Sequence, residues 1–224
     1  MTIRAKLYAA IVLTILGPLA TTAVALNAMS DLGGSFDEVK ERGRHESLAL
    51  EVKFDVTDMN GWQTAYGYAG DGRFRPEFVR SATVLDSELA RAERELTDAT
   101  ERTLVSQLRR EYERFMALDA VAFSALRQGD AARVKRIFLG PELLRFEAIA
   151  TTASKLAAYQ FEQAQAADAA FDDDREDARK QLIAVALGAG IVIILLLVTA
   201  QDVVRMALEG ERRSRGEPGD EKPS

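Results

Sequence analysis

Two apolar stretches without a charged residue stand out in the chain, at 7–26 and 182–200. Each has about 20 residues, the length that an α-helix needs to cross the hydrocarbon core of a bilayer. Arg4 and Lys6 precede the first stretch and Arg205 follows the second. The positive-inside rule therefore predicts two transmembrane helices with both termini in the cytoplasm.

This topology divides the chain into five parts and predicts a membrane protein with two spans. They are a cytoplasmic N-terminus at 1–6, transmembrane helix 1 at 7–26, an extracytoplasmic domain at 27–181, transmembrane helix 2 at 182–200, and a short cytoplasmic tail at 201–224, disordered towards its end. A second interpretation stays open, because Ala23-Val24-Ala25 fits the site at which signal peptidase cleaves. Cleavage there would leave only the second helix as an anchor.

Between the two stretches, apolar residues recur in alternating steps of three and four, the period of a buried helix face. The turn signals lie at Gly70–Pro76 and Gln128–Asp130, with a softer polar break near Thr100. The pattern predicts four helices, at 28–69, 76–98, 101–128 and 131–181. No stretch alternates with a period of two, so no sheet is expected.

A repeat of about 3.5 residues is typical of helices that pack at shallow angles in bundles. We therefore predict an all-α protein, in which an antiparallel four-helix bundle lies outside the cytoplasm and is flanked by the two transmembrane helices. Glu111 is the one charged residue in the apolar stripe of the third helix.

Composition excludes several kinds of chemistry. The chain of 224 residues has a net charge of −6, no cysteine and one histidine, His45. Disulfides, thiol nucleophiles and multi-histidine metal sites are therefore excluded, and His45 between Arg44 and Glu46 is expected at the surface. No nucleotide-binding or hydrolase motif occurs, and no basic face suits a nucleic acid. We expect no enzyme, no cofactor and no metal; calcium binding by the acidic run 172–174 is a weak alternative.

One group of polar and aromatic residues suggests a small-molecule site inside the bundle. It combines the region of the only tryptophan with inward positions of the fourth helix, and it comprises Asn60, Trp62, Gln63, Tyr66, Tyr159 and Gln163. The competing interpretation is that these residues are hydrogen-bonded core positions that fix the helix register. Gly61 and Gly67 in the same region suggest close packing of helices.

The runs Phe54–Tyr66, Phe78–Ala82, Arg127–Asp130 and Leu139–Pro141, in this order, resemble the four-helix-bundle sensory domain of bacterial methyl-accepting chemotaxis receptors. The resemblance covers residues 1 to about 200. It implies a homodimer whose outer domains bind a small solute and shift one membrane helix against another.

The chain departs from such receptors after the second membrane helix. Its last 24 residues are too few for the HAMP linker and the signalling region that follow in the family. We therefore expect a sensory module that signals through a partner, as a homodimer or as a heterodimer with full-length receptors. Two alternatives stay open: a membrane-tethered bundle that docks another protein without binding a ligand, and a receptor whose remainder is encoded downstream.

Overall fold

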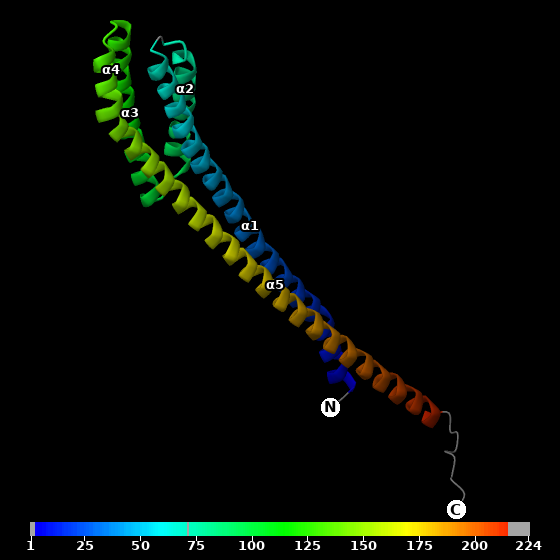
Figure 1. Ribbon diagram of the computed structural model, residues 1–224. Coiled ribbons are helices and arrows are strands. Elements are labelled where there is room, and N and C mark those ends of the chain that lie inside the picture. The colour runs from blue at the N-terminus through cyan, green and yellow to red at the C-terminus, as the bar shows by residue number, and fades with distance from the viewer. Residues whose placement is uncertain (1–2, 71, 215–224) are drawn as a thin grey trace, which may run out of the picture. The chain divides into compact units, whose positions relative to one another are not determined.

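A computed structural model describes residues 3–70 and 72–214 (Figure 1). No strand occurs among these residues, which confirms the all-α class. The elements are α1 (Ile3–Ala69), α2 (Arg75–Glu95), α3 (Ala99–Arg127), α4 (Ala131–Ile137), the π-helical segment η1 (Phe138–Glu142) and α5 (Leu143–Ser214). The chain forms two compact units: a central unit, Asp37–Ala170, and a terminal unit with the described residues up to Phe36 and from Phe171 onward.

The central unit has a continuous apolar core, in which the expected stripes of the first two core helices are buried. On α1 the buried stripe positions are Leu48, Val52, Met59 and Tyr66. On α2 they are Phe78, Ala82, Leu85, Leu89 and Ala92, and Leu96 just beyond the helix continues the stripe. Burial of each large apolar side chain stabilises the fold by roughly 1.5–3 kcal/mol, so the core holds these helices together.

In the fourth predicted helix the apolar spacing favours an inner face through Ile149, Leu156, Tyr159 and Ala166, and on α5 the buried face drifts away from this phase. Gln160 and Ala167 are buried, whereas Tyr159 is half-buried and Ala166 is exposed. A straight helix has about 3.6 residues per turn and drifts by about 20° per heptad from a strict 3.5 repeat. The expected stripe is correct at Ile149 and Leu156 and is displaced by one residue at Gln160, three turns after Ile149.

The break between the second and third core helices lies at 96–98, earlier than the expected break near Thr100. Leu96 is extended, and Asp98 caps α3 by accepting hydrogen bonds from the backbone N–H groups of Thr100 and Glu101. The Glu101 carboxylate accepts in return from the Asp98 backbone N–H, at 2.9 Å. This reciprocal capping box fixes the start of α3.

The expected turn at Gln128–Asp130 is confirmed. Gly129 has φ = +74°, a left-handed conformation that glycine adopts without the penalty that a Cβ imposes. The Asp130 carboxylate then accepts from the backbone N–H of Arg133 and caps α4, at 2.9 Å.

The expected fourth core helix, 131–181, is interrupted at its beginning. Pro141 has no backbone N–H and its ring clashes with the carbonyl four residues earlier. The chain responds with η1 and with a non-helical Gly140 at φ = −119° and ψ = −109°. The regular helix α5 begins only at Leu143 and continues without a break to Ser214.

In the terminal unit, residues of α1 and α5 lie against one another. The Phe36 and Phe171 rings are 6.1 Å apart, and the Ser35 hydroxyl donates to Asp174. Large apolar side chains such as Leu19 and Leu187 are exposed.

Two helical stretches, Thr14–Ala69 and Ala131–Met206, contain a window that is long and apolar enough to cross a membrane. Only 6% of the first window and none of the second is buried. The two apolar stretches are not separate helices, since each continues into a helix of the central unit. Residues 215–224, which make up most of the segment expected to be disordered, lie outside the described residues.

Candidate functional site

A pocket of about 680 Å³ opens in the central unit, where α1, α3, α4, η1 and α5 meet. Small-molecule sites in proteins have volumes of about 300–1,000 Å³ and combine apolar walls with a few polar groups. The wall follows this pattern, with Asn60 and Gln63 from α1, Phe115 from α3, and Phe138, Glu142 and Phe146 from η1 and α5.

Gly67 allows η1 to approach α1 closely at this pocket. The Phe138 ring lies directly against the Gly67 backbone, in the space that a Cβ atom at position 67 would fill. At Gly61, by contrast, no atom lies within 4 Å of the position of a Cβ. Close packing is therefore confirmed for Gly67 and is wrong for Gly61.

Glu142 is the most unusual side chain of the pocket, because only 1% of it is exposed. Gln63 Nε2 donates a hydrogen bond to its Oε1 atom, and its Oε2 atom has no hydrogen-bond partner. Burial and the nearby Asp119 raise the pKa of Glu142 to about 8, although Arg75 opposes the shift. A buried acid without a cationic partner keeps its proton at neutral pH.

A second buried acid, Asp119, lies next to this site and is fully paired. Tyr66 donates its hydroxyl to Oδ1, and Arg75 Nη1 contacts Oδ2. The same Arg75 nitrogen lies 3.0 Å from the Tyr66 hydroxyl oxygen. Burial raises the pKa of Asp119 to about 7, while the adjacent guanidinium favours its charged form.

Three aromatic rings hold the Arg75 guanidinium in place. Its carbon lies 5.1 Å from the ring centre of Tyr66, 4.7 Å from that of Phe78 and 4.5 Å from that of Phe123. Cation–π contacts of this length stabilise a partly desolvated guanidinium by about 1 kcal/mol or more. Arg75 is thus committed to Asp119 and to these rings, and it makes no direct ion pair with Glu142 among the described contacts.

The structure brings two of the six expected site residues, Asn60 and Gln63, to the pocket. Tyr66 is buried in the Arg75 cluster, where its ring meets that of Phe138 at 5.8 Å. Trp62 points to another side of α1, packs on Phe74 at 6.2 Å and lines a separate shallow hollow.

The two expected site residues of α5 lie outside this pocket. Tyr159 donates its hydroxyl to Asp98 at 2.8 Å, at the turn between α2 and α3. Gln163 is half-buried one helical turn further on. The six residues therefore do not form a single site in the central unit.

Sequence reasoning missed Glu142, Phe138 and Lys135 as pocket residues. The sequence contained a signal for Glu142, which lies four residues before Phe146 and seven before Ile149, in phase with the inner stripe of α5. A charged residue at such a position is buried when the helix packs. Phe138 had no comparable signal, because the irregular η1 segment determines its direction.

A third buried acid, Glu101, lies at the turn between α2 and α3 and is well supplied with donors. Gln160 Nε2 donates to it at 2.8 Å, and Arg42 and His45 lie 3.8 Å and 3.9 Å from the same oxygen. His45 was expected at the surface and is instead only 6% exposed. The helical phase explains the difference, because His45 precedes the buried Leu48 and Val52 by three and seven residues.

Glu111, the misfit in the α3 stripe, is held between two arginines. Arg114 and Arg145 lie 2.7 Å and 2.9 Å from its two oxygens. These contacts hold the pKa of Glu111 below its usual range against the effect of burial. The residue therefore joins α3 to α5 through ion pairs and leaves no oxygen for a ligand.

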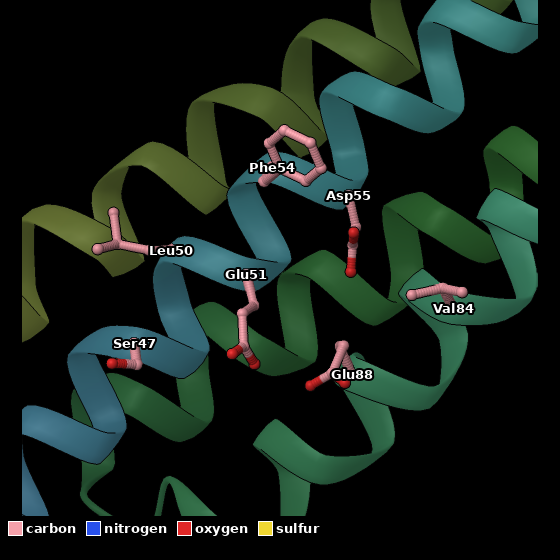
Figure 2. A pocket seen from close by; sticks show the side chains of 7 residues that line it. All are labelled: Ser47, Leu50, Glu51, Phe54, Asp55, Val84 and Glu88. Carbon is pink, nitrogen blue, oxygen red and sulfur yellow. The ribbon is translucent and has the colours of Figure 1, made fainter.

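A shallow surface hollow between α1 and α2 carries a group of acids (Figure 2). Glu51 and Asp55 extend from α1 and Glu88 from α2, beside the exposed Leu50 and Phe54. Burial and the carboxylates of Glu88, Asp58 and Glu51 raise the pKa of Asp55 to about 6. Arg91 lies 3.2 Å from Glu51 and 3.4 Å from Glu88, so this surface is a charge network around one arginine.

Among the described residues, no group of three or more histidine or acidic side chains is arranged to hold a metal ion. Comparison with protein-family models, curated proteins and solved structures finds no match to this chain.

Proposed function

We propose that this chain is a membrane-anchored, chemoreceptor-like sensory module that binds a small solute and signals through a partner. The segment 27–181 is its antiparallel four-helix bundle outside the cytoplasm, and 7–26 and 182–200 are its membrane helices. The partner is a second copy or a full-length receptor in the bacterial inner membrane.

This proposal rests mainly on one observation. The central unit contains a pocket of about 680 Å³ that is lined in part by Glu142, whose buried Oε2 atom has no hydrogen-bond partner. Burying an unsatisfied polar atom costs about 1–3 kcal/mol. Other buried atoms also lack a partner, such as His45 Nδ1 and Gln160 Oε1, but Glu142 differs from these two residues in lining the pocket. A bound solute that completes the hydrogen bonding of Glu142 Oε2 explains why the acid is present. The two apolar helical stretches support the membrane anchoring.

A thermal-shift screen of the full chain in lipid nanodiscs tests the binding function. A solute at about 100 times its Kd stabilises the folded protein by about 2.7 kcal/mol, so at least one class of compound is expected to raise Tm. Leu143 lines the pocket and is 42% exposed, whereas Leu144 is 63% exposed and is not among the pocket residues. Leu143→Trp is therefore expected to abolish the shift by filling the pocket, and Leu144→Trp to preserve it.

A labelling experiment tests the topology, since the chain has no cysteine of its own. Ser106→Cys and Gln201→Cys both introduce a thiol at an exposed position. A membrane-impermeant maleimide applied to cells with a permeabilised outer membrane is expected to label position 106. Position 201 is expected to react only after the inner membrane is opened, and the reverse order of labelling contradicts the proposal.

The docking alternative has one observation in its favour. Phe54 is 70% exposed and lines the same hollow between α1 and α2 as Leu50 and Val84 (Figure 2). Exposed apolar faces often mark protein contacts. Photocrosslinking in cells from position 54, with position 161 of α5 as the exposed control, distinguishes the two functions. A single envelope protein crosslinked only from position 54, together with an empty thermal-shift screen, favours docking.

A further inference from the structure

The two buried acids at the pocket are unequally paired. Asp119 is 0% and Glu142 is 1% exposed, and the guanidinium of Arg75 makes its ion pair with Asp119 and acts on Glu142 only from a distance. Glu142 receives only the neutral donor Gln63. Fully buried acids without a cationic partner are rare in proteins. An ionised Glu142 would therefore lack a cationic partner at Oε2.

The rest of the wall specifies what accompanies that charge. Phe115, Phe138 and Phe146 present aromatic surface to the pocket. Aromatic faces attract cations and also bury hydrocarbon. Asn60, Thr64 and Tyr68 add neutral polar groups. This combination suits a molecule with a cationic head and an apolar body.

Lys135 limits the number of positive charges that a ligand in this pocket can carry. It lines the same pocket and is itself exposed. A second positive charge on a ligand would face this ammonium at the edge of the pocket and be repelled. A single charge near Glu142 avoids the repulsion.

We propose that the pocket binds an organic monoamine, with its ammonium group donating to Glu142 Oε2 and its apolar body against Phe138 and Phe146. This inference rests on the proposed sensory function and names the ligand class of the same site. An organic acid is disfavoured because it places a second carboxyl beside Glu142. A neutral alcohol leaves Glu142 protonated and forms no ion pair with it.

Amine binding is expected to release a proton from Glu142, and this release can be measured. Burial and Asp119 of α3 raise the pKa of Glu142, and Arg75 of α2 lowers it. Lys135 of α4 lines the pocket, and α1 contributes the neutral Gln63. With the pocket empty the Glu142 carboxyl is protonated at pH 7. An ammonium ion stabilises the carboxylate, so the proton leaves to the buffer as the amine binds.

The test is isothermal titration calorimetry of the full chain in nanodiscs at pH 7, in two buffers of different ionisation enthalpy. The probes are three compounds of similar shape: 2-phenylethylamine, 2-phenylethanol and 3-phenylpropionate. The amine is expected to bind at least about tenfold more tightly than the other two, with release of close to one proton. Leu143→Trp is expected to block amine binding. This comparison needs no change at Glu142 and therefore does not depend on the folding of a variant.

Two matched variants sharpen the result. Glu142→Gln removes the charge and keeps the shape, so amine affinity is expected to fall at least about tenfold and proton release to disappear. Glu147→Gln, an exposed glutamate of the same helix, is expected to change neither quantity.

The outcomes separate the two proposals. If the alcohol or the acid binds as tightly as the amine and Leu143→Trp blocks it, the amine class is wrong and the sensory pocket stands. The amine class is also wrong if Glu142→Gln binds the amine as tightly as the unchanged protein. If neither these probes nor the thermal-shift screen yields a ligand of the folded protein, both proposals fail.

Discussion

Two buried glutamates in the central unit, Glu101 and Glu142, have the same degree of burial and opposite surroundings. Each is 1% exposed. Glu101 accepts from the Asp98 backbone and from Gln160, with Arg42 and His45 within 4 Å. Glu142 accepts from Gln63 alone and borders a pocket.

The difference shows how a structural acid is distinguished from a binding acid in a helical protein. Burial by itself does not separate them, because both side chains are removed from water. The number and charge of the hydrogen-bond donors around each carboxyl group separate the two, since a carboxylate is stabilised in the interior only when its oxygens are paired. Both oxygens of Glu101 accept hydrogen bonds, whereas the Oε2 atom of Glu142 has no hydrogen-bond partner.

Asp119→Ala is expected to have the largest effect. The change leaves the Arg75 guanidinium without its acid and the Tyr66 hydroxyl without its acceptor. Removing one partner of a largely buried ion pair costs about 3 kcal/mol or more. Urea unfolding followed through the fluorescence of Trp62, the only tryptophan, measures this loss. A loss below about 1 kcal/mol contradicts the view that this acid is structural.

Glu101→Ala is expected to cost about 2 kcal/mol, because it removes half of the capping box and the acceptor for Gln160. Glu113→Gln on the same helix is exposed and serves as the control, with an expected change within about 0.5 kcal/mol. The contrast between the two glutamates breaks down if Glu101→Ala is as harmless as the control.

Glu142→Gln is expected to change the pH dependence of stability. The pKa of this carboxyl rises from an ordinary value of 4.5 to about 8 on folding. Between these values a folded protein with Glu142 binds more protons at this group than the unfolded chain does, so the contribution of Glu142 to stability is greatest below about pH 4.5 and falls as pH rises towards 8. The slope from one group is at most about 1.4 kcal/mol per pH unit.

Urea unfolding at pH 5.5 and pH 7.5 measures this slope. Asp119, whose pKa is also raised, contributes to the fall of stability with pH in the unchanged chain and in Glu142→Gln alike. Glu142→Gln is therefore expected to be less sensitive to pH than the unchanged chain, and Glu147→Gln equally sensitive. Identical slopes in all three proteins contradict the assignment of an uncharged, pocket-facing Glu142.

The smallest effect is expected from a pair of glycine variants on α1. Gly61→Ala meets open space and is expected to stabilise the helix by up to about 1 kcal/mol. Gly67→Ala pushes the Phe138 ring aside and is expected to destabilise by about 1 kcal/mol, the net of helix propensity and overpacking. Amine affinity is expected to fall only in the second variant, because Phe138 forms part of the pocket wall. Equal behaviour of the two variants contradicts the close contact.

The sequence predicted the helices well where burial alone determines them. The stripes through Leu48 and Val52 on α1 and through Leu85 and Leu89 on α2 depend only on which residues avoid water, and apolar spacing records that directly. The turn at Gly129 was equally clear, because a left-handed conformation restricts the choice of residue.

The sequence predicted much less of the candidate site, for two physical reasons. Apolar periodicity counts acids as outward-facing, so Glu101, Asp119 and Glu142 were not recognised as buried. The pocket also depends on the irregular segment around Pro141, whose backbone no helical repeat describes. Asn60 and Gln63 could be predicted because they are polar residues beside a tryptophan and two glycines, whereas Glu142, the partner of Gln63, lies 79 residues later along the chain.

The contact between Gly67 and Phe138 also constrains how sequences of this kind diverge. The ring occupies the space of the missing side chain, so the two positions share one fixed volume. Homologous chains that keep the pocket are expected to change them together, with a larger residue at 67 only where 138 carries a smaller one. In an alignment of such chains, the side-chain volumes at these two positions, 71 residues apart, are expected to be correlated, and their charges are not.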